Sequence, residues 1–420
     1  MTVMKRMLSL ALALALGATL LTGCGGDSSS ASSSGASSSG ASSSAASSSA
    51  GEAESFDLAA VTDPFLATAG IAGDAVVAKV GEYEIDAASL LYWLNYQVEN
   101  YLQQLQSMGY PITEIPWDSA DETGTTMAES ALAGALDAAA LYAILPILAE
   151  DAEVELPQDD LDMPEKFLTQ LETQLGSKEA ANHLLWSQMM DAEHYTNFYL
   201  DGCRFKLLTD YYYGEGSENY PTDAEVKGYA ENDLGYYYVK HILLSIKDAE
   251  TGEELDQAGK DAKRATAMDL LDQLRKADDP VALFDTLMNE YSEDPGLASY
   301  PDGYEAYKGQ MVAEFEQASL ALKDGEISEI VESAHGYHII LRLPLDLDSF
   351  RESLIYGLMD QRVADILYAY GVNRTEAFEQ IDPASFRTNV VALQAAVETE
   401  LQAIMDAKAQ ANSETPGSAG

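Results

Sequence analysis

The chain has 420 residues, and 47% of them are hydrophobic, which is enough to build the cores of about two or three ordinary domains. Its 70 acidic and 23 basic residues give a formal net charge of −47. A charge of this size repels nucleic acids, so we predict no nucleic-acid partner. A solvated acidic surface that limits self-association is the simplest explanation of the charge, and attraction of basic polypeptides is the alternative.

The first 23 residues have the pattern of a cleaved secretion signal. Lys5 and Arg6 precede an apolar stretch, 7–21, that is too short to span a bilayer comfortably. The next motif, Leu21-Thr22-Gly23-Cys24, resembles the lipobox of bacterial lipoproteins, in which cleavage precedes a cysteine that carries a diacylglycerol. This resemblance implies lipidation of Cys24 and anchoring to the outer face of the cell membrane. An ordinary secretion signal with a chance cysteine is the alternative.

Small polar residues dominate the segment 24–51, which repeats Ser, Ala and Gly almost without interruption. Such a composition offers no apolar surface to offset the entropy of ordering. We therefore predict a flexible linker between the lipidated cysteine and the folded part of the chain.

The region 52–235 is predicted to be mostly helical after one initial strand at 75–80. Asp86 has the position of an N-cap before a helix with an apolar stripe. Two capping boxes indicate further helix starts: Thr126 with Glu129, and Thr222 with Glu225.

At residue 237 the periodicity changes from helical to alternating, and the segment 236–346 is predicted to be an α+β domain with a small antiparallel sheet. The expected order is strand, two helices, a loop rich in Gly, Pro and Asp, a third helix and two strands. These elements are predicted at 238–245, 254–276, 280–291, 292–309, 310–322, 327–332 and 337–343. The segment 347–410 is predicted to form helices that pack on the first helical region, and 411–420 to be a disordered tail.

Four motifs in the α+β segment resemble the parvulin, or PpiC-type, rotamase family, in the correct order. They are Lys240–Leu244, Tyr291–Gly296, Gly309–Glu316, and the pair Gly325–Ser328 with Gly336–Ile340. One such fragment would be weak evidence, whereas four of them with the correct spacing are specific. Together with the lipobox and the helical flanks, they resemble the PrsA-type foldase lipoproteins of Gram-positive bacteria.

The resemblance implies a parvulin-like domain between helical chaperone segments and a peptidyl-prolyl cis/trans isomerase without metal or cofactor. Its substrates would be unfolded or partly folded secreted polypeptides with X-Pro bonds, outside the cytoplasmic membrane. A non-covalent mechanism is expected, because the enzyme has only to favour the twisted amide. The alternative is a holdase chaperone whose parvulin domain is an inactive scaffold.

The same resemblance assigns catalytic roles to three residues, His241, Asp294 and His338. Some parvulins carry a cysteine where this chain has Asp294, and a carboxylate there argues against covalent catalysis. The residues expected to bind substrate are Met311, Phe315, Ser333 and Tyr337. Each also has a structural alternative: the two histidines and the apolar residues could belong to the core, and Asp294 could cap a turn.

Replacement of Cys24 by Ala should release the protein from the membrane fraction, since the lipobox cysteine is the predicted point of attachment. Fractionation of cells that express each form, followed by an alkaline carbonate wash, measures the effect. Retention of the Cys24→Ala protein in the washed membranes would contradict the prediction.

Overall fold

The structure is a computed structural model that describes residues 56–109, 115–248 and 250–414. The predicted signal peptide, Cys24 and the linker 24–51 lie outside these residues. The chain forms two compact units: the first comprises the described residues up to Tyr212 and from Asp360 onward, and the second comprises Tyr213–Met359. The boundaries predicted for the α+β segment, 236 and 346, lie within the second unit.

The first unit is mainly helical and contains a three-stranded antiparallel sheet of order β2-β1-β7. Its helices and strands are η1 (Leu58–Ala60), α2 (Pro64–Ala69), β1 (Val76–Val80), β2 (Tyr83–Asp86), α3 (Ala87–Ser107), α4 (Met127–Ala143), α5 (Leu145–Asp151), α6 (Gln158–Leu175), α7 (Lys178–Ser187), α8 (Ala192–Tyr213), β7 (Val372–Arg374), η3 (Phe378–Gln380) and α14 (Pro383–Glu414). Helices α4 and α5 together are long and apolar enough to cross a membrane, but one such stretch is weak evidence because core helices share these properties.

Capping residues fix the starts of the helices, as the sequence predicts. The carboxylate of Asp86 accepts a hydrogen bond from the Ser89 amide at 2.8 Å at the start of α3. Thr126 and Glu129 form a complete capping box at α4, in which each side chain bonds to the other residue's backbone amide. These bonds satisfy amides that have no partner inside the helix.

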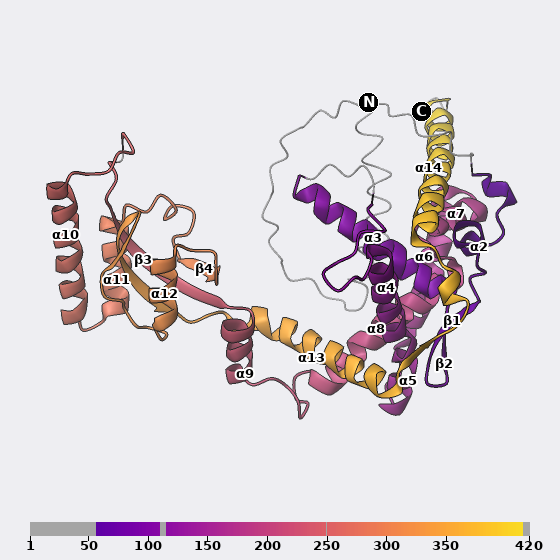
Figure 1. Cartoon of the computed structure of the whole chain (residues 1–420), viewed down its shortest axis with the longest axis horizontal. Helices are drawn as coiled ribbons and strands as arrows, with labels where there is room; N and C mark the ends of the chain where they lie inside the picture. The colour runs from indigo at the N-terminus through magenta and orange to yellow at the C-terminus, as the bar shows by residue number, and fades with distance from the viewer. Residues whose placement is uncertain (1–55, 110–114, 249, 415–420) are drawn as a thin grey trace, which may run out of the picture. The chain divides into compact units, whose positions relative to one another are not determined.

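The C-terminal segment returns to the first strands and helices of the chain. Strand β7 pairs with β1, and α14 packs against α2 and α7 (Figure 1). The side chain of Asn389 donates to the Thr68 carbonyl at 2.9 Å, and Arg387 pairs with Glu99 at 2.6 Å. Helix α14 continues to Glu414, so residues 411–414 are helical, whereas a disordered tail was predicted from residue 411. The helix extends this far because each residue added to an existing helix gains one backbone hydrogen bond.

The second unit is built on a four-stranded antiparallel sheet of order β4-β3-β6-β5, which confirms the predicted α+β class. Its elements are α9 (Asp223–Gly228), η2 (Tyr229–Asp233), β3 (Tyr236–Ser245), α10 (Gln257–Lys276), α11 (Pro280–Tyr291), β4 (Tyr304–Tyr307), α12 (Ala313–Ala321), β5 (Val331–Ser333), β6 (Gly336–Leu343) and the first part of α13 (Leu347–Tyr370). Thr222 and Glu225 form the predicted capping box at α9.

Successive side chains of β3 and β6 point to opposite faces of this sheet, so each face carries its own core. On one face, Ile242, Leu244, Ile339 and Leu341 pack against α10 and α11. On the other face, a smaller cluster gathers around Phe315 of α12; its buried members are Tyr237, Val239, Ala306, Phe315 and Ile340.

Several predicted elements differ from the structure. The strand predicted at 327–332 is formed only at β5, Val331–Ser333, and the first helical region contains two early strands, β1 and β2, where one was predicted. The loop 292–309 contains a fourth strand, β4, in which Ala306 is the one buried residue, so its alternation is short and hard to detect. The third helix begins at Ala313 and not at residue 310, because the side chain of Gln310 accepts a hydrogen bond from the Tyr307 amide and closes a turn there.

Gly336→Ala should destabilise the second unit by roughly 1–3 kcal/mol. Gly336 has φ +147° at the start of β6, and an added Cβ would lie 2.2 Å from the Leu244 carbonyl oxygen, which the β3–β6 pairing holds in place. Gly357→Ala in α13 is the matched control, since its Cβ would meet no atom within 4 Å and alanine favours helix. Urea unfolding of both variants measures the difference, and equal midpoints would contradict the prediction.

Candidate active site

Polar side chains from every strand of the second sheet, and from one loop, converge on the face covered by α12. His241 comes from β3, His338 from β6, Ser333 from β5 and Tyr304 from β4. Asp294 comes from the loop after α11. The two histidines and Ser333 are each less than a tenth exposed.

These side chains form one continuous chain of hydrogen bonds. His338 Nε2 lies 2.7 Å from Ser333 Oγ, and its Nδ1 lies 3.1 Å from Nδ1 of His241. His241 Nε2 lies 3.1 Å from Asp294 Oδ2, which also accepts a hydrogen bond from the hydroxyl of Tyr304 at 2.5 Å. The other carboxylate oxygen, Oδ1, accepts from the Gly296 amide at 3.1 Å.

One assignment of protons satisfies every bond with both histidines neutral. The His335 amide donates to Ser333 Oγ, so the Ser333 hydroxyl is free to donate to Nε2 of His338. His338 then carries its proton on Nδ1 and donates to His241, which carries its own proton on Nε2 and donates to Asp294. This inferred assignment makes Asp294 the common acceptor at the end of the chain.

The ionisation of these groups agrees with that assignment. Burial by itself would raise the pKa of Asp294, but hydrogen bonds from His241, Tyr304 and the Gly296 amide outweigh it and lower the pKa to about 2. Burial, with the neighbouring His241 and His335, lowers the pKa of His338 to about 3. The site therefore combines an ionised carboxylate with a neutral imidazole near pH 7.

An aromatic ring and a thioether provide the apolar side of the site. The ring of Phe315 stands edge-on to His241 and His338, with centroid distances of 5.1 and 5.3 Å. Phe315 is 4% exposed, and the partly buried Met311 packs in the same cluster. The structure thus brings together six of the seven residues predicted for the site: His241, Asp294, Met311, Phe315, Ser333 and His338.

Tyr337 is the predicted site residue that lies elsewhere. It is 5% exposed and packs on the opposite face of the sheet, in the core formed with α10 and α11. Because Tyr337 and His338 are consecutive in β6, their side chains must point to opposite faces. The assignment of Tyr337 to substrate binding is therefore corrected.

Tyr304 is the site residue that sequence analysis missed. It lies in the strand hidden within the predicted loop, and its hydroxyl makes the shortest hydrogen bond to Asp294. The alternation of Tyr304, Glu305, Ala306 and Tyr307 is the only local signal for it.

The low pKa of His338 makes the stability of the second unit depend on pH. An unfolded histidine binds a proton below its ordinary pKa of 6.5, whereas folded His338 does not until about 3. The free energy of unfolding should therefore fall as the pH decreases from 6.5 toward 3, by up to about 1.4 kcal/mol per pH unit for this proton. In His338→Gln this contribution is absent, so the pH dependence should be less steep.

Urea unfolding followed by circular dichroism at several pH values measures this difference. Tryptophan fluorescence supplies an internal control, because all three tryptophans, Trp93, Trp117 and Trp186, lie in the first unit. Equal pH slopes for the two proteins would contradict the neutral state of His338.

Comparison with known proteins gives a family match at the second unit. Residues 241–343 match the model of the Rotamase family, described as the PPIC-type PPIASE domain. The foldase protein PrsA of Staphylococcus aureus, strain Newman, is 32% identical over 200 residues, which cover 47% of this chain and 57% of the relative. The chain thus spans little more than half the length of the curated relatives it matches.

Solved structures include PrsA from Bacillus subtilis, 20% identical over 80% of this chain and 93% of that one, with a TM-score of 0.21. PrsA from Bacillus cereus is 21% identical over 60% of this chain and 89% of that one, with a TM-score of 0.23. Because both TM-scores are below 0.5, no conclusion about this chain is drawn from these two structures. The family match and the sequence relatives confirm the predicted resemblance: the chain carries a PPIC-type rotamase domain at 241–343 and is similar to PrsA foldases over about half of its length.

Proposed function

We propose that the chain is a peptidyl-prolyl cis/trans isomerase that assists the folding of secreted proteins. The observation that carries this proposal is the meeting of the buried network of His241, His338 and Asp294 with the ring of Phe315 on one face of the sheet. An apolar wall can hold a proline ring, and a fixed polar network beside it can hold the twisted amide.

The chemistry requires no covalent step. The barrier to rotation about an X-Pro bond is about 20 kcal/mol and comes from the loss of amide resonance. Asp294 would be a poor nucleophile, because three donors already occupy its two oxygens. The neutral His338 has both nitrogens engaged within the network. These features support a mechanism in which the site desolvates and orients the amide while no proton moves between heavy atoms.

The wider role follows from the relatives and from the N-terminus. The relatives are named foldases, and the predicted lipid on Cys24 would hold the protein at the outer face of the cell membrane. Its partners would then be unfolded or partly folded secreted polypeptides that contain X-Pro bonds, together with the membrane itself through the anchor.

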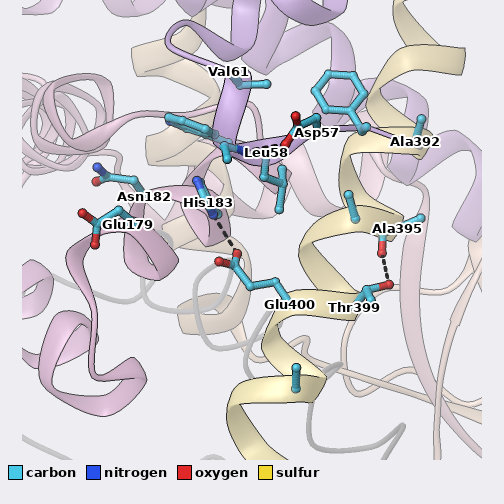
Figure 2. Close-up of a pocket in the computed structure, with 15 residues that line it drawn as sticks. Asp57, Leu58, Val61, Glu179, Asn182, His183, Ala392, Ala395, Thr399 and Glu400 are labelled. Atoms are coloured by element: carbon cyan, nitrogen blue, oxygen red, sulfur yellow. Dashed lines mark hydrogen bonds and ion pairs between the residues drawn. The ribbon is translucent and has the colours of Figure 1, made fainter. Parts of the chain in front are cut away.

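A holdase role is the second candidate, and an apolar groove in the first unit favours it. This groove lies between η1, α7 and α14 (Figure 2). Its volume is about 1000 Å³. Leu58, Val61, Trp186 and four alanines of α14 line it, and His183 pairs with Glu400 at 2.7 Å in its wall. Such a surface is suited to an extended apolar segment of a client.

A proline-isomerisation assay on the soluble chain that begins at Glu52 tests the main proposal. This form keeps both units and omits the predicted signal and linker. Catalysed isomerisation of an X-Pro tetrapeptide is expected. Suppression of client aggregation without any catalysis would instead favour the holdase.

Met311→Ala and Phe315→Ala should each lower kcat/KM by about 5-fold to 150-fold, equivalent to roughly 1–3 kcal/mol of transition-state binding. The reason is that each removes apolar wall from the site. Phe315 is nearly buried, so its replacement also weakens the core, and urea unfolding must be measured beside kcat/KM.

Leu320→Ala is the matched control for these two variants. Leu320 is an apolar residue of α12 that is 38% exposed and lies outside the cluster around Phe315. Its replacement should leave kcat/KM unchanged. Activity close to that of the unmodified protein in folded Met311→Ala and Phe315→Ala would contradict the pocket assignment.

A further inference from the structure

The hydroxyl of Tyr304 joins β4 to the loop after α11, which carries Asp294. It pairs with Val239 of β3, so the sheet fixes its backbone. Its ring stands edge-on to His241 with a centroid distance of 5.6 Å and leans on Tyr300 at 5.0 Å. From this position the hydroxyl donates to Oδ2 of Asp294 at 2.5 Å, the same oxygen that accepts from His241.

The backbone of the loop is held independently of Tyr304. The Glu293 amide donates to the Leu243 carbonyl at 2.8 Å, and the Leu243 amide donates to Ser292 Oγ at 3.2 Å. These bonds tie the loop to β3. Tyr304 therefore acts on the carboxylate of Asp294 and is not needed to place the loop itself.

Gly296 supplies an independent observation on the same hydroxyl. A Cβ at Gly296 would lie 2.0 Å from the Tyr304 hydroxyl oxygen and 3.2 Å from the ring carbon that bears it. Because Gly296 has no side chain, the Tyr304 hydroxyl can occupy the space where a Cβ would otherwise lie. The Gly296 amide binds the other oxygen of the same carboxylate, so both features converge on the orientation of Asp294.

We propose that Tyr304 is a positioning residue of the isomerase site, whose hydroxyl holds the Asp294 carboxylate in the orientation that fixes the tautomer of His241. With this donor present, Oδ2 faces His241, and His241 keeps its proton on Nε2 and its lone pair on Nδ1 toward His338. Without it, the carboxylate can turn about its Cβ–Cγ bond, and the bond to His241 loses its fixed geometry. This inference rests on the proposed isomerase function.

The titratable groups around Asp294 support this arrangement. His241 faces it from β3, Tyr304 from β4, and His338 from β6 through His241. The neighbouring Glu293 is paired with Lys263 of α10, and Lys240 of β3 is paired with Asp285 of α11. Hydrogen bonding to Asp294 also raises the pKa of Tyr304 beyond what burial alone would do, so Tyr304 remains a donor throughout the neutral range.

Tyr304→Phe in the chain that begins at Glu52 tests the proposal with two readouts. The kcat for an X-Pro tetrapeptide should fall by about 3-fold to 30-fold with KM changed less than about 2-fold, because the substrate contacts stay in place. Long-range ¹⁵N–¹H spectra of the histidine rings should show His241 with a fixed Nε2–H tautomer in the unmodified protein and a mixture of tautomers in the variant. The chain has only five histidines, so the signals can be assigned by single replacements.

Gly296→Ala in both backgrounds provides the second test. In the chain with Tyr304 the added methyl group collides with the hydroxyl, so kcat should fall and the His241 tautomer should become mixed. In the Tyr304→Phe background the 2.0 Å contact with the hydroxyl is gone and the nearest neighbours are the ring carbon at 3.2 Å and Asp294 Oδ1 at 3.5 Å, so Gly296→Ala should add little further loss. Independent, multiplicative losses from the two replacements would count against the shared hydroxyl contact.

An unchanged His241 tautomer in Tyr304→Phe, with kcat within about 2-fold of the unmodified protein, would overturn the proposal. Failure of the isomerase function itself would be seen differently. In that case the unmodified protein would show no catalysis, while the ring spectra of the variants would still report whether Tyr304 fixes His241.

Discussion

The antiparallel pairing of β3 with β6 is the interaction on which both cores of the second unit and the site depend. Eight residue pairs align these strands, from Tyr238 opposite Leu343 to Ser245 opposite Gly336. In this register His241 and His338 are diagonal neighbours on one face of the sheet, within hydrogen-bonding distance of each other. The side chains on the opposite face of the sheet pack in the larger apolar core. A shift by one residue would exchange the two faces, burying imidazoles against α10 and α11 and exposing leucines and isoleucines. The apolar core therefore specifies the position of the two histidines of the candidate site.

The same arrangement explains why a buried polar network is tolerated beside an apolar wall. Every hydrogen-bonding atom of the His241 and His338 rings has a partner, and the chain of donors ends at a carboxylate with three donors of its own. Satisfied in this way, the groups avoid most of the penalty of burial and become rigid. Rigidity matters for the proposed isomerase reaction, because a site that acts on a rotating bond would have to present a fixed shape to a twisted amide.

Much of this organisation could be predicted from local sequence patterns. The alternation in β3, the capping residues at α3, α4 and α9, and the spaced motifs of the second unit all lie in short stretches whose physical consequences are local. The error at Tyr337 arose because a motif was read as a block, although neighbouring strand residues must point to opposite faces. Tyr304 was missed for a different reason: its contact to Asp294 forms only when a four-residue strand inside an irregular loop adds to the sheet edge. The sequence contains both residues, but their meeting depends on tertiary structure.

The topology of the chain also makes the first unit depend on the second. Strand β1 pairs with β7, although the whole second unit lies between them in the sequence, and α14 packs against α2 and α7. Closing so long a loop costs conformational entropy. Folding of the second unit lowers this cost, because it brings its own ends together: Arg351 donates to the Pro221 carbonyl at 2.5 Å, and Tyr229 lies within hydrogen-bonding distance of Ser353. A folded second unit thus shortens the effective loop between β1 and β7. The β3–β6 pairing that fixes the candidate site therefore also assists completion of the helical unit, which contains the apolar groove between η1, α7 and α14.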